Sequence, residues 1–276
     1  MGYRLAWQRI GPPIFLGLLP VVVVVWAIIL SVHLGELAVD FHYELYPEAK
    51  LVLHGSNPFP AVAASGSNTI WSIAALLPAL PLVPPRPAAA DAVMTAFLIV
   101  TFVVALLLLG IRDWRIFGVT FLWPPVIAGF QTRNLTLPLV LLVAVVWRYR
   151  DRQVIAGGLL GLAVAAKFFL WPLVPFLFAI RRRASSALAC VLAIASFGLM
   201  LPFISPIGYL RLIKSLTDRF DRESYTAYEF LTDAGVNSPL AHFVTYAVGL
   251  TVLYLAMRWR SGRLARLANG RSEAAG

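Results

Sequence analysis

Long apolar runs, separated by short clusters of arginine, recur from one end of this chain to the other. Of its 276 residues, 60% are hydrophobic and only 13% are charged, and the mean hydropathy is +0.80. Soluble domains of this length are far more polar. An apolar run of about 20 residues is long enough to cross the hydrocarbon core of a bilayer as a helix. The sequence therefore predicts an all-α, polytopic membrane protein.

The basic residues give the chain a net charge of +10. Nucleic-acid-binding proteins can carry such a charge, but they gather it on one face or along a helix. Here the arginines lie between apolar runs, which is the pattern of cytoplasmic loops in membrane proteins. We therefore expect no nucleic-acid partner. Four basic clusters are assigned to the cytoplasmic side, at residues 112–115, 148–152, 181–183 and 258–271.

These clusters predict a topology. The first apolar run, residues 13–32, is too long for the core of a signal peptide and is interpreted as a retained span with a cytoplasmic N-terminus. The run from 154 to 180 has a basic cluster at each end, so it must leave and return as two short helices that turn near Lys167 and Phe168. By the same argument, the apolar runs before and after residues 131–134 are predicted to be a pair of short helices joined by an outward-facing turn.

A run broken by prolines, residues 70–83, is interpreted as re-entrant, which leaves eight full spans and both termini in the cytoplasm. The alternative is a full span there and an irregular pair later. Helices of about 14 residues rise only ~21 Å, less than the ~30 Å hydrocarbon core. Short helices are tolerated where they line a water-filled cavity. We expect a bundle of about eight to nine helices, including short or re-entrant ones, around a cavity at the outer face.

The expected domain organisation is simple. One transmembrane domain covers residues 1–257, with outer loops at 35–69 and 205–238, and a basic cytoplasmic tail follows at 258–276. The expected location is the plasma membrane, with multiple passes. Cys190 is the only cysteine, so an internal disulfide is excluded.

The first outer loop carries a dense polar cluster directly after a membrane helix. Ionisable groups are costly near a membrane, and they mark functional sites there. The topology places this loop on the same face as the turn at Gln131 and Asn134 and as Lys167. A carboxylate, two amides and cations would then surround one depression. The cluster, within residues 39–59, contains the acidic and basic side chains of Asp40, His42, Glu44, Glu48, Lys50 and His54.

Each of these residues also has a purely structural interpretation. Asp40 could cap the first turn of an interfacial helix, and Lys167 could extend along a helix end towards water. Gln131 and Asn134 could satisfy backbone groups in a tight turn. The spacing of the two histidines fits no zinc pattern, which favours interfacial side chains over metal ligands.

Three segments, in order, resemble motifs of the family 87 glycosyltransferases. The first has Asp40, Tyr43 and Ala49 followed by residues 53–59, Leu-His-Gly-Ser-Asn-Pro-Phe. The second is the Pro-rich run 124–134, which ends in Gln-Thr-Arg-Asn, and the third is residues 156–167, which end at Lys167. The resemblance implies a GT-C-type fold and a hexose, typically mannose, taken from a polyprenyl-phosphate carrier on the outer face. Members of the family usually continue for several further spans, so this chain resembles a C-terminally short member.

That resemblance implies roles for the polar residues. Asp40 would be the general base of an inverting transfer, and Lys167 or Arg133 would neutralise the donor phosphate. Gln131, Asn134 and Asn57 would bind sugar hydroxyls, while His42, His54 and Glu48 would bind the acceptor, a glycolipid or a polysaccharide. We expect no metal, because no Asp-x-Asp motif is present, and no cofactor beyond the lipid-linked sugar itself. Membrane lipids are further partners, and the oligomeric state stays open.

Two other classes of function fit the same features. Broken helices and the intramembrane Lys167 are also found in transporters, although no inverted repeat is visible here. A non-catalytic, truncated family member that serves as a subunit is the other alternative.

Overall fold

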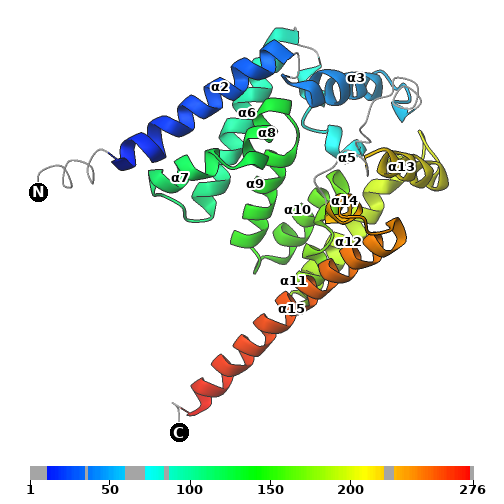
Figure 1. The fold of residues 1–276 in the computed structure, drawn as a ribbon. Coiled ribbons are helices and arrows are strands. Elements are labelled where there is room, and N and C mark those ends of the chain that lie inside the picture. Colours follow the sequence, from blue (N-terminus) through cyan, green and yellow to red (C-terminus); the bar gives the residue numbers. More distant parts are fainter. Residues whose placement is uncertain (1–10, 35–36, 60–71, 84–86, 221–226, 274–276) are drawn as a thin grey trace, which may run out of the picture.

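Every regular element in the described part of the chain is helical. The computed structural model describes residues 11–34, 37–59, 72–83, 87–220 and 227–273, which form thirteen α-helices and four short π or 3-10 turns (Figure 1). The all-α prediction is confirmed. The expected number of eight to nine helices is too low, because the two polar loops also contain helices and the run 117–130 divides at Trp123-Pro-Pro125.

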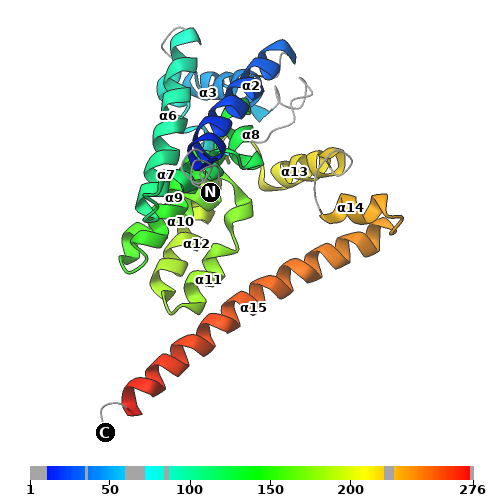
Figure 2. The ribbon, with the colours of Figure 1, turned by 60° about the vertical axis from the view of Figure 1, so that its left-hand side comes forward.

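In the described part of the chain, three helices have the length and the apolar composition needed to cross a membrane. The qualifying stretches are Gly11–Leu30, Ala89–Leu108 and Ser238–Leu255. They belong respectively to η1 and α2 (Ile14–Leu18 and Leu19–Leu34), to α6 (Pro87–Leu108) and to α15 (Ser238–Glu273). Only 6% of the residues in the first and third stretches are buried, as expected for helices that face lipid. In Figure 2, α15 runs away from the bundle through the predicted basic tail.

The remaining apolar helices are shorter than a full span, where eight full spans were expected. They are α9 (Thr136–Arg148), α10 (Gln153–Ala166), α11 (Leu173–Ala179) and α12 (Arg183–Gly198). The predicted break near Lys167 is confirmed. Lys167 is extended, with φ −142° and ψ 108°, and the single turn η4 (Phe168–Leu170) leads through Pro172 into α11.

The predicted turn at residues 131–134 is also present. Before it, the run splits at Trp123-Pro-Pro125 into α7 (Trp114–Phe121) and α8 (Pro124–Thr132). Arg133 takes the left-handed conformation, with φ 55°, and α9 begins at Thr136. This reversal of direction explains why α8 and α9 lie against each other.

The described part of the first polar loop contains one helical segment. The π turn η2 (Phe41–Leu45) continues directly into α3 (Tyr46–Leu53). Pro47 lies at the start of α3, directly after the π turn, and the segment continues through it.

The predicted re-entrant run forms only α5 (Ile73–Leu76) and the turn η3 (Leu80–Leu82), which are too short to cross; residues 70 and 71 lie outside the described part. The second polar loop contains α13 (Pro206–Phe220) and α14 (Ala227–Asp233).

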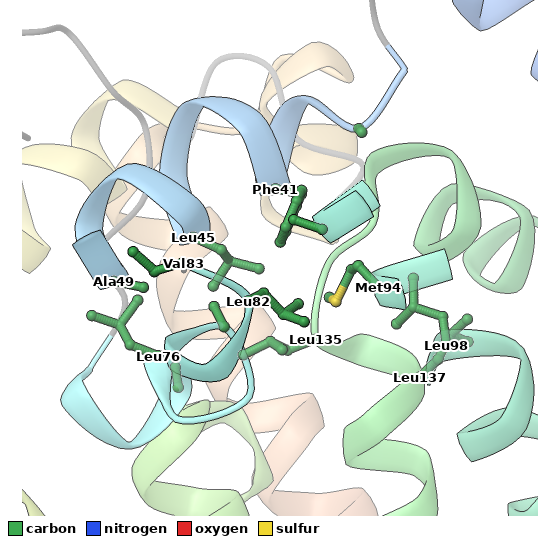
Figure 3. Close-up of a cluster of buried hydrophobic side chains, with 14 of the residues drawn as sticks. Phe41, Leu45, Ala49, Leu76, Leu82, Val83, Met94, Leu98, Leu135 and Leu137 are labelled. Atoms are coloured by element: carbon green, nitrogen blue, oxygen red, sulfur yellow. The ribbon is translucent and has the colours of Figure 1, made fainter. Parts of the chain in front are cut away.

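The polar loop lies on the main apolar core (Figure 3). Phe41, Leu45 and Ala49 form the buried face of η2 and α3, and each is at most 1% exposed. They pack in one cluster with residues of α5, η3, α6 and the start of α9: Leu76, Leu82, Val83, Met94, Leu98, Leu135 and Leu137. The acidic residues Asp40, Glu44 and Glu48 each directly precede one of these core residues, so the packing of the apolar face also fixes where their side chains lie.

Candidate functional site

The segment that carries Asp40 is joined to the α8–α9 turn through the backbone. The amide of Ala38 donates a 2.7 Å hydrogen bond to the carbonyl oxygen of Gln131. Both sides of this junction contain a left-handed residue other than glycine, Ala38 with φ 61° and Arg133 with φ 55°. Such conformations are uncommon, persist only where neighbouring contacts enforce them, and cluster at functional sites.

Asp40 does not act as a helix cap. It stands at the first position before η2, but its backbone is already helical and its side chain makes no capping hydrogen bond. Its carboxylate hydrogen-bonds to the side chains of Thr132 and Asn134 instead. The structural alternative for Asp40 is therefore wrong, and the predicted approach of the loop to the 131–134 turn is confirmed at this residue.

The environment of Asp40 has two opposing effects on its acidity. Burial raises the pKa of this carboxyl above its ordinary value, since a buried carboxylate loses hydration. Hydrogen bonds from Thr132 and Asn134 and the charge of Lys167 oppose that shift. The net direction is upward. Asp40 is consequently a stronger base than an aspartate in water.

Lys167 lies within electrostatic reach of Asp40 and of Glu44. It stands at the end of α10, and that end is anchored to α5: the hydroxyl of Ser72 donates a 2.5 Å hydrogen bond to the carbonyl of Ala165. The ammonium group also lies 5.8 Å from the centre of the Phe169 ring. Lys167 thus belongs to the same cluster as Asp40, as the sequence predicted.

Asn134 serves the backbone as well as Asp40. Its Oδ1 accepts a 2.8 Å hydrogen bond from the amide of Thr136, which starts α9, and its Nδ2 donates to the hydroxyl of Thr132 at 3.0 Å. Gln131 contacts the loop through its carbonyl oxygen. The sequence argument did not select Thr132, although its position inside the turn was a usable signal.

Asp91, on α6, was also missed. Its Oδ1 lies 2.6 Å from Nη1 of Arg133 and 2.7 Å from Nε2 of His42. The predicted phosphate ligand Arg133 is therefore engaged in an ion pair. The signal in the sequence was an acidic residue near the start of an otherwise apolar run.

Two of the predicted ligands have other contacts. Nδ2 of Asn57 donates to the carbonyl of Phe203 at 2.6 Å, and its Oδ1 accepts from the amide of Phe59. His54 is exposed at the end of α3, where its Nδ1 lies 2.7 Å from the carbonyl oxygen of Lys50. No contact between described residues brings either side chain to Asp40.

Glu48 is a buried carboxyl group on the same helical segment. Its side chain belongs to a residue that is only 5% exposed, and Oε1 has no hydrogen-bond partner among the described residues. Burial, and secondly the charge of Glu44, raise its pKa to about 9. Burial, and secondly the charge of Glu48, raise the pKa of the partly buried Tyr209 on α13 to about 12. Near neutral pH, Glu48 is a neutral acid that can donate a hydrogen bond.

The site therefore offers a base of raised pKa, hydroxyl and amide groups beside it, and a cation within reach. In the described residues, no group of three histidine, cysteine or acidic side chains has the geometry to hold a metal ion. No family model, curated protein or solved structure matches this chain.

Proposed function

We propose that this protein is a membrane glycosyltransferase that moves a hexose, most simply mannose, from a polyprenyl-phosphate carrier to an acceptor hydroxyl on the outer face of the plasma membrane. The observation that carries the proposal is the environment of Asp40, a half-buried carboxylate next to Thr132, Asn134 and Lys167. The resemblance to the family 87 glycosyltransferases, and so to a GT-C-like bundle, supports the same reaction.

The proposed reaction uses Asp40 as a general base. The acceptor oxygen forms a bond to the anomeric carbon, the bond from that carbon to the lipid phosphate breaks, and the proton of the acceptor passes to Asp40. Attack from the side opposite the phosphate inverts the anomeric configuration. A positioned general base typically contributes 10²–10⁴-fold in rate. The upward shift of the pKa of Asp40 favours this role, because a stronger base takes the proton more readily.

The leaving phosphate requires a positive charge. Lys167 supplies it, since its ammonium group lies within electrostatic reach of Asp40 and a charge close to the reacting atoms stabilises the developing anion. A lipid-phosphate leaving group lacks the diphosphate for which many sugar transferases recruit a metal. We therefore propose a metal-independent reaction.

The remaining polar groups would bind hydroxyls. Asn134 and Gln131 lie on the side of the turn that meets Asp40, so they are assigned to the transferred sugar. Glu48, on the same helical segment as Asp40, is assigned to the acceptor. His42 already pairs with Asp91 and is left out of the proposed site. Asn57 and His54 have other partners and are left out of the proposed site.

The decisive experiment is transfer from a panel of radiolabelled polyprenyl-phosphate sugars in membranes that contain the wild type or Asp40→Asn. We expect a loss of at least 100-fold in Asp40→Asn with unchanged expression. The matched control is Asp113→Asn, since Asp113 only caps α7, through a hydrogen bond from the amide of Arg115, and asparagine also caps helices. Full activity in Asp40→Asn would contradict the proposal.

Transport is the second candidate, because the chain is broken at Lys167 in the manner of transporter helices. Flux of the same sugars into liposomes, measured in parallel, separates the two. Flux without transfer identifies a transporter, while neither activity leaves a subunit role.

A further inference from the structure

One carboxylate oxygen joins the two segments that form the candidate site. Asp91 lies on α6, near the start of the candidate span Ala89–Leu108. Its Oδ1 is 2.7 Å from Nε2 of His42 and 2.6 Å from Nη1 of Arg133. His42 follows Asp40 by two residues, and Arg133 lies between Thr132 and Asn134, the two residues that hydrogen-bond to Asp40. Asp91 therefore contacts one residue of each segment, His42 beside Asp40 and Arg133 in the turn, without contacting Asp40 itself.

The conformation of Arg133 shows why such a contact matters. Its φ of 55° is in the left-handed region, which residues with a Cβ rarely adopt. Arg133 stands in the chain between Thr132 and Asn134, so a change in its backbone conformation would move these two residues relative to each other. The Arg133 side chain is 14% exposed, and its ion pair with Asp91 ties it to α6.

We propose that Asp91 is a positioning residue, which fixes the Thr132–Asn134 turn and the Asp40 segment to the same end of α6. The hydrogen bond from Ala38 to Gln131 is a second attachment between the same two segments, made by the backbone. Two attachments are enough to define both the distance and the orientation between Asp40 and its hydrogen-bond partners. In its catalytic consequence, this inference rests on the proposed function.

This assignment also gives different roles to the two cations, Arg133 and Lys167. Arg133 has its charge balanced at short range by Asp91, so it acts mainly in shaping the turn. Lys167 then carries the attraction for the leaving phosphate. Loss of Asp91 should disturb the geometry of catalysis more than the affinity for the donor, because a small displacement of a catalytic group mainly lowers the rate of the chemical step.

The kinetic test compares Asp91→Ala, Asp91→Asn and Asp91→Glu in the full-length protein, with the donor panel described above. For Asp91→Ala we expect at least a tenfold fall in kcat with less than a threefold change in KM for the donor, and for Asp91→Glu a partial recovery. Asp113→Ala, at the cap of α7, is the control and should keep wild-type kinetics. A rise in the donor KM at unchanged kcat, or equal activity in Asp91→Ala and wild type, would overturn the inference.

A thermal double-mutant cycle tests the positioning contact without any activity. Asp91→Asn, Arg133→Met and the double variant are unfolded in detergent micelles, since asparagine keeps the shape of the side chain and removes its charge. When one substitution is already present, we expect the other to change Tm by less than half as much as it does in the wild type. Additive changes in Tm would overturn the contact. A wild type that transfers no sugar but shows the coupling would disprove the glycosyltransferase proposal and leave the Asp91 contact standing.

Discussion

In two regions of this protein, segments of the chain pack closely together, but the interactions that allow it are opposite in kind. The α10–α12 interface is apolar and depends on small residues: a Cβ added at Gly157 would lie 2.7 Å from the carbonyl oxygen of Ser185, and one at Gly161 would lie 2.8 Å from Cβ of Leu192. The junction between the Asp40 segment and the α8–α9 turn is polar and depends on hydrogen bonds and on two residues in the left-handed conformation. The first arrangement is a small-xxx-small contact, typical of helix packing in membranes.

The difference suggests a division between stability and chemistry. Dispersion contacts between close helices are numerous and make one packing much more stable than others. The polar junction contains buried charge and backbone strain, which cost free energy and are typical of functional sites. Substitutions in the two regions should therefore be distinguishable, because the first should lose the fold and the second should lose function.

The largest effect is expected from Gly161→Leu. No space exists for the side chain, so α10 and α12 must separate, and we expect no folded protein in detergent-solubilised membranes by size-exclusion chromatography. Gly158→Ala is the matched control, since its Cβ would meet only Cδ1 of Leu192 at 4.0 Å, an ordinary contact. A folded Gly161→Leu protein would show that this interface does not determine the packing of the bundle.

A smaller effect, on function alone, is expected from Thr132→Val. Valine has nearly the same shape but removes one of the hydrogen bonds that lower the pKa of Asp40, so this pKa should rise further. We expect on the order of a tenfold loss of transfer and an upward shift of the acid limb of the pH–rate profile, measured with the same donor panel. Thr120→Val, on α7, serves as the control. Its hydroxyl only bonds to the carbonyl of Ile116 in its own helix.

Glu48 provides a pH-dependent test of stability. In the folded protein its pKa is raised to about 9 from an ordinary value of 4.5, so the folded state binds the proton more tightly than the unfolded state. Its contribution to stability is therefore fully present below about pH 4.5 and falls as the pH rises to about 9, by at most about 1.4 kcal/mol per pH unit.

Glu48→Gln keeps a neutral side chain at every pH. We expect its Tm to match the wild type near pH 5 and to exceed it increasingly up to pH 9, as measured by thermal unfolding in micelles. Glu229→Gln, on α14, is a control for which we expect no such divergence. Parallel pH profiles of Glu48→Gln and the wild type would contradict the buried, neutral state of Glu48.

The smallest effect is expected from Ala38→Gly. Glycine removes the cost of a Cβ at φ 61°, while it gains freedom in the unfolded chain, so the two effects nearly cancel. We expect a change of about 1 kcal/mol or less in the free energy of unfolding and wild-type transfer. A large loss of transfer would show that the strain at Ala38 itself contributes to the site.

The sequence by itself determined the all-α class and the positions of two breaks between helices. Apolar runs bounded by arginine clusters specified that class, and the basic clusters at both ends of the run 154–180 predicted the break near Lys167 that the structure contains. The turn at 131–134 was predicted for the same reason. These are local properties of composition, because burying an apolar run and excluding a charge from it need no distant partner.

Only the tertiary structure decided which groups meet. Arg133 pairs with Asp91, 42 residues away in the chain, and Thr132, which no motif marked, reaches Asp40. The side chain of Asn57 hydrogen-bonds to the carbonyl of Phe203, although the family resemblance assigned it to a sugar hydroxyl. A side chain chooses its partner by distance and direction in three dimensions. These are set by the way the core residues of η2, α6 and α9 pack together, and not by the spacing of polar residues along the chain.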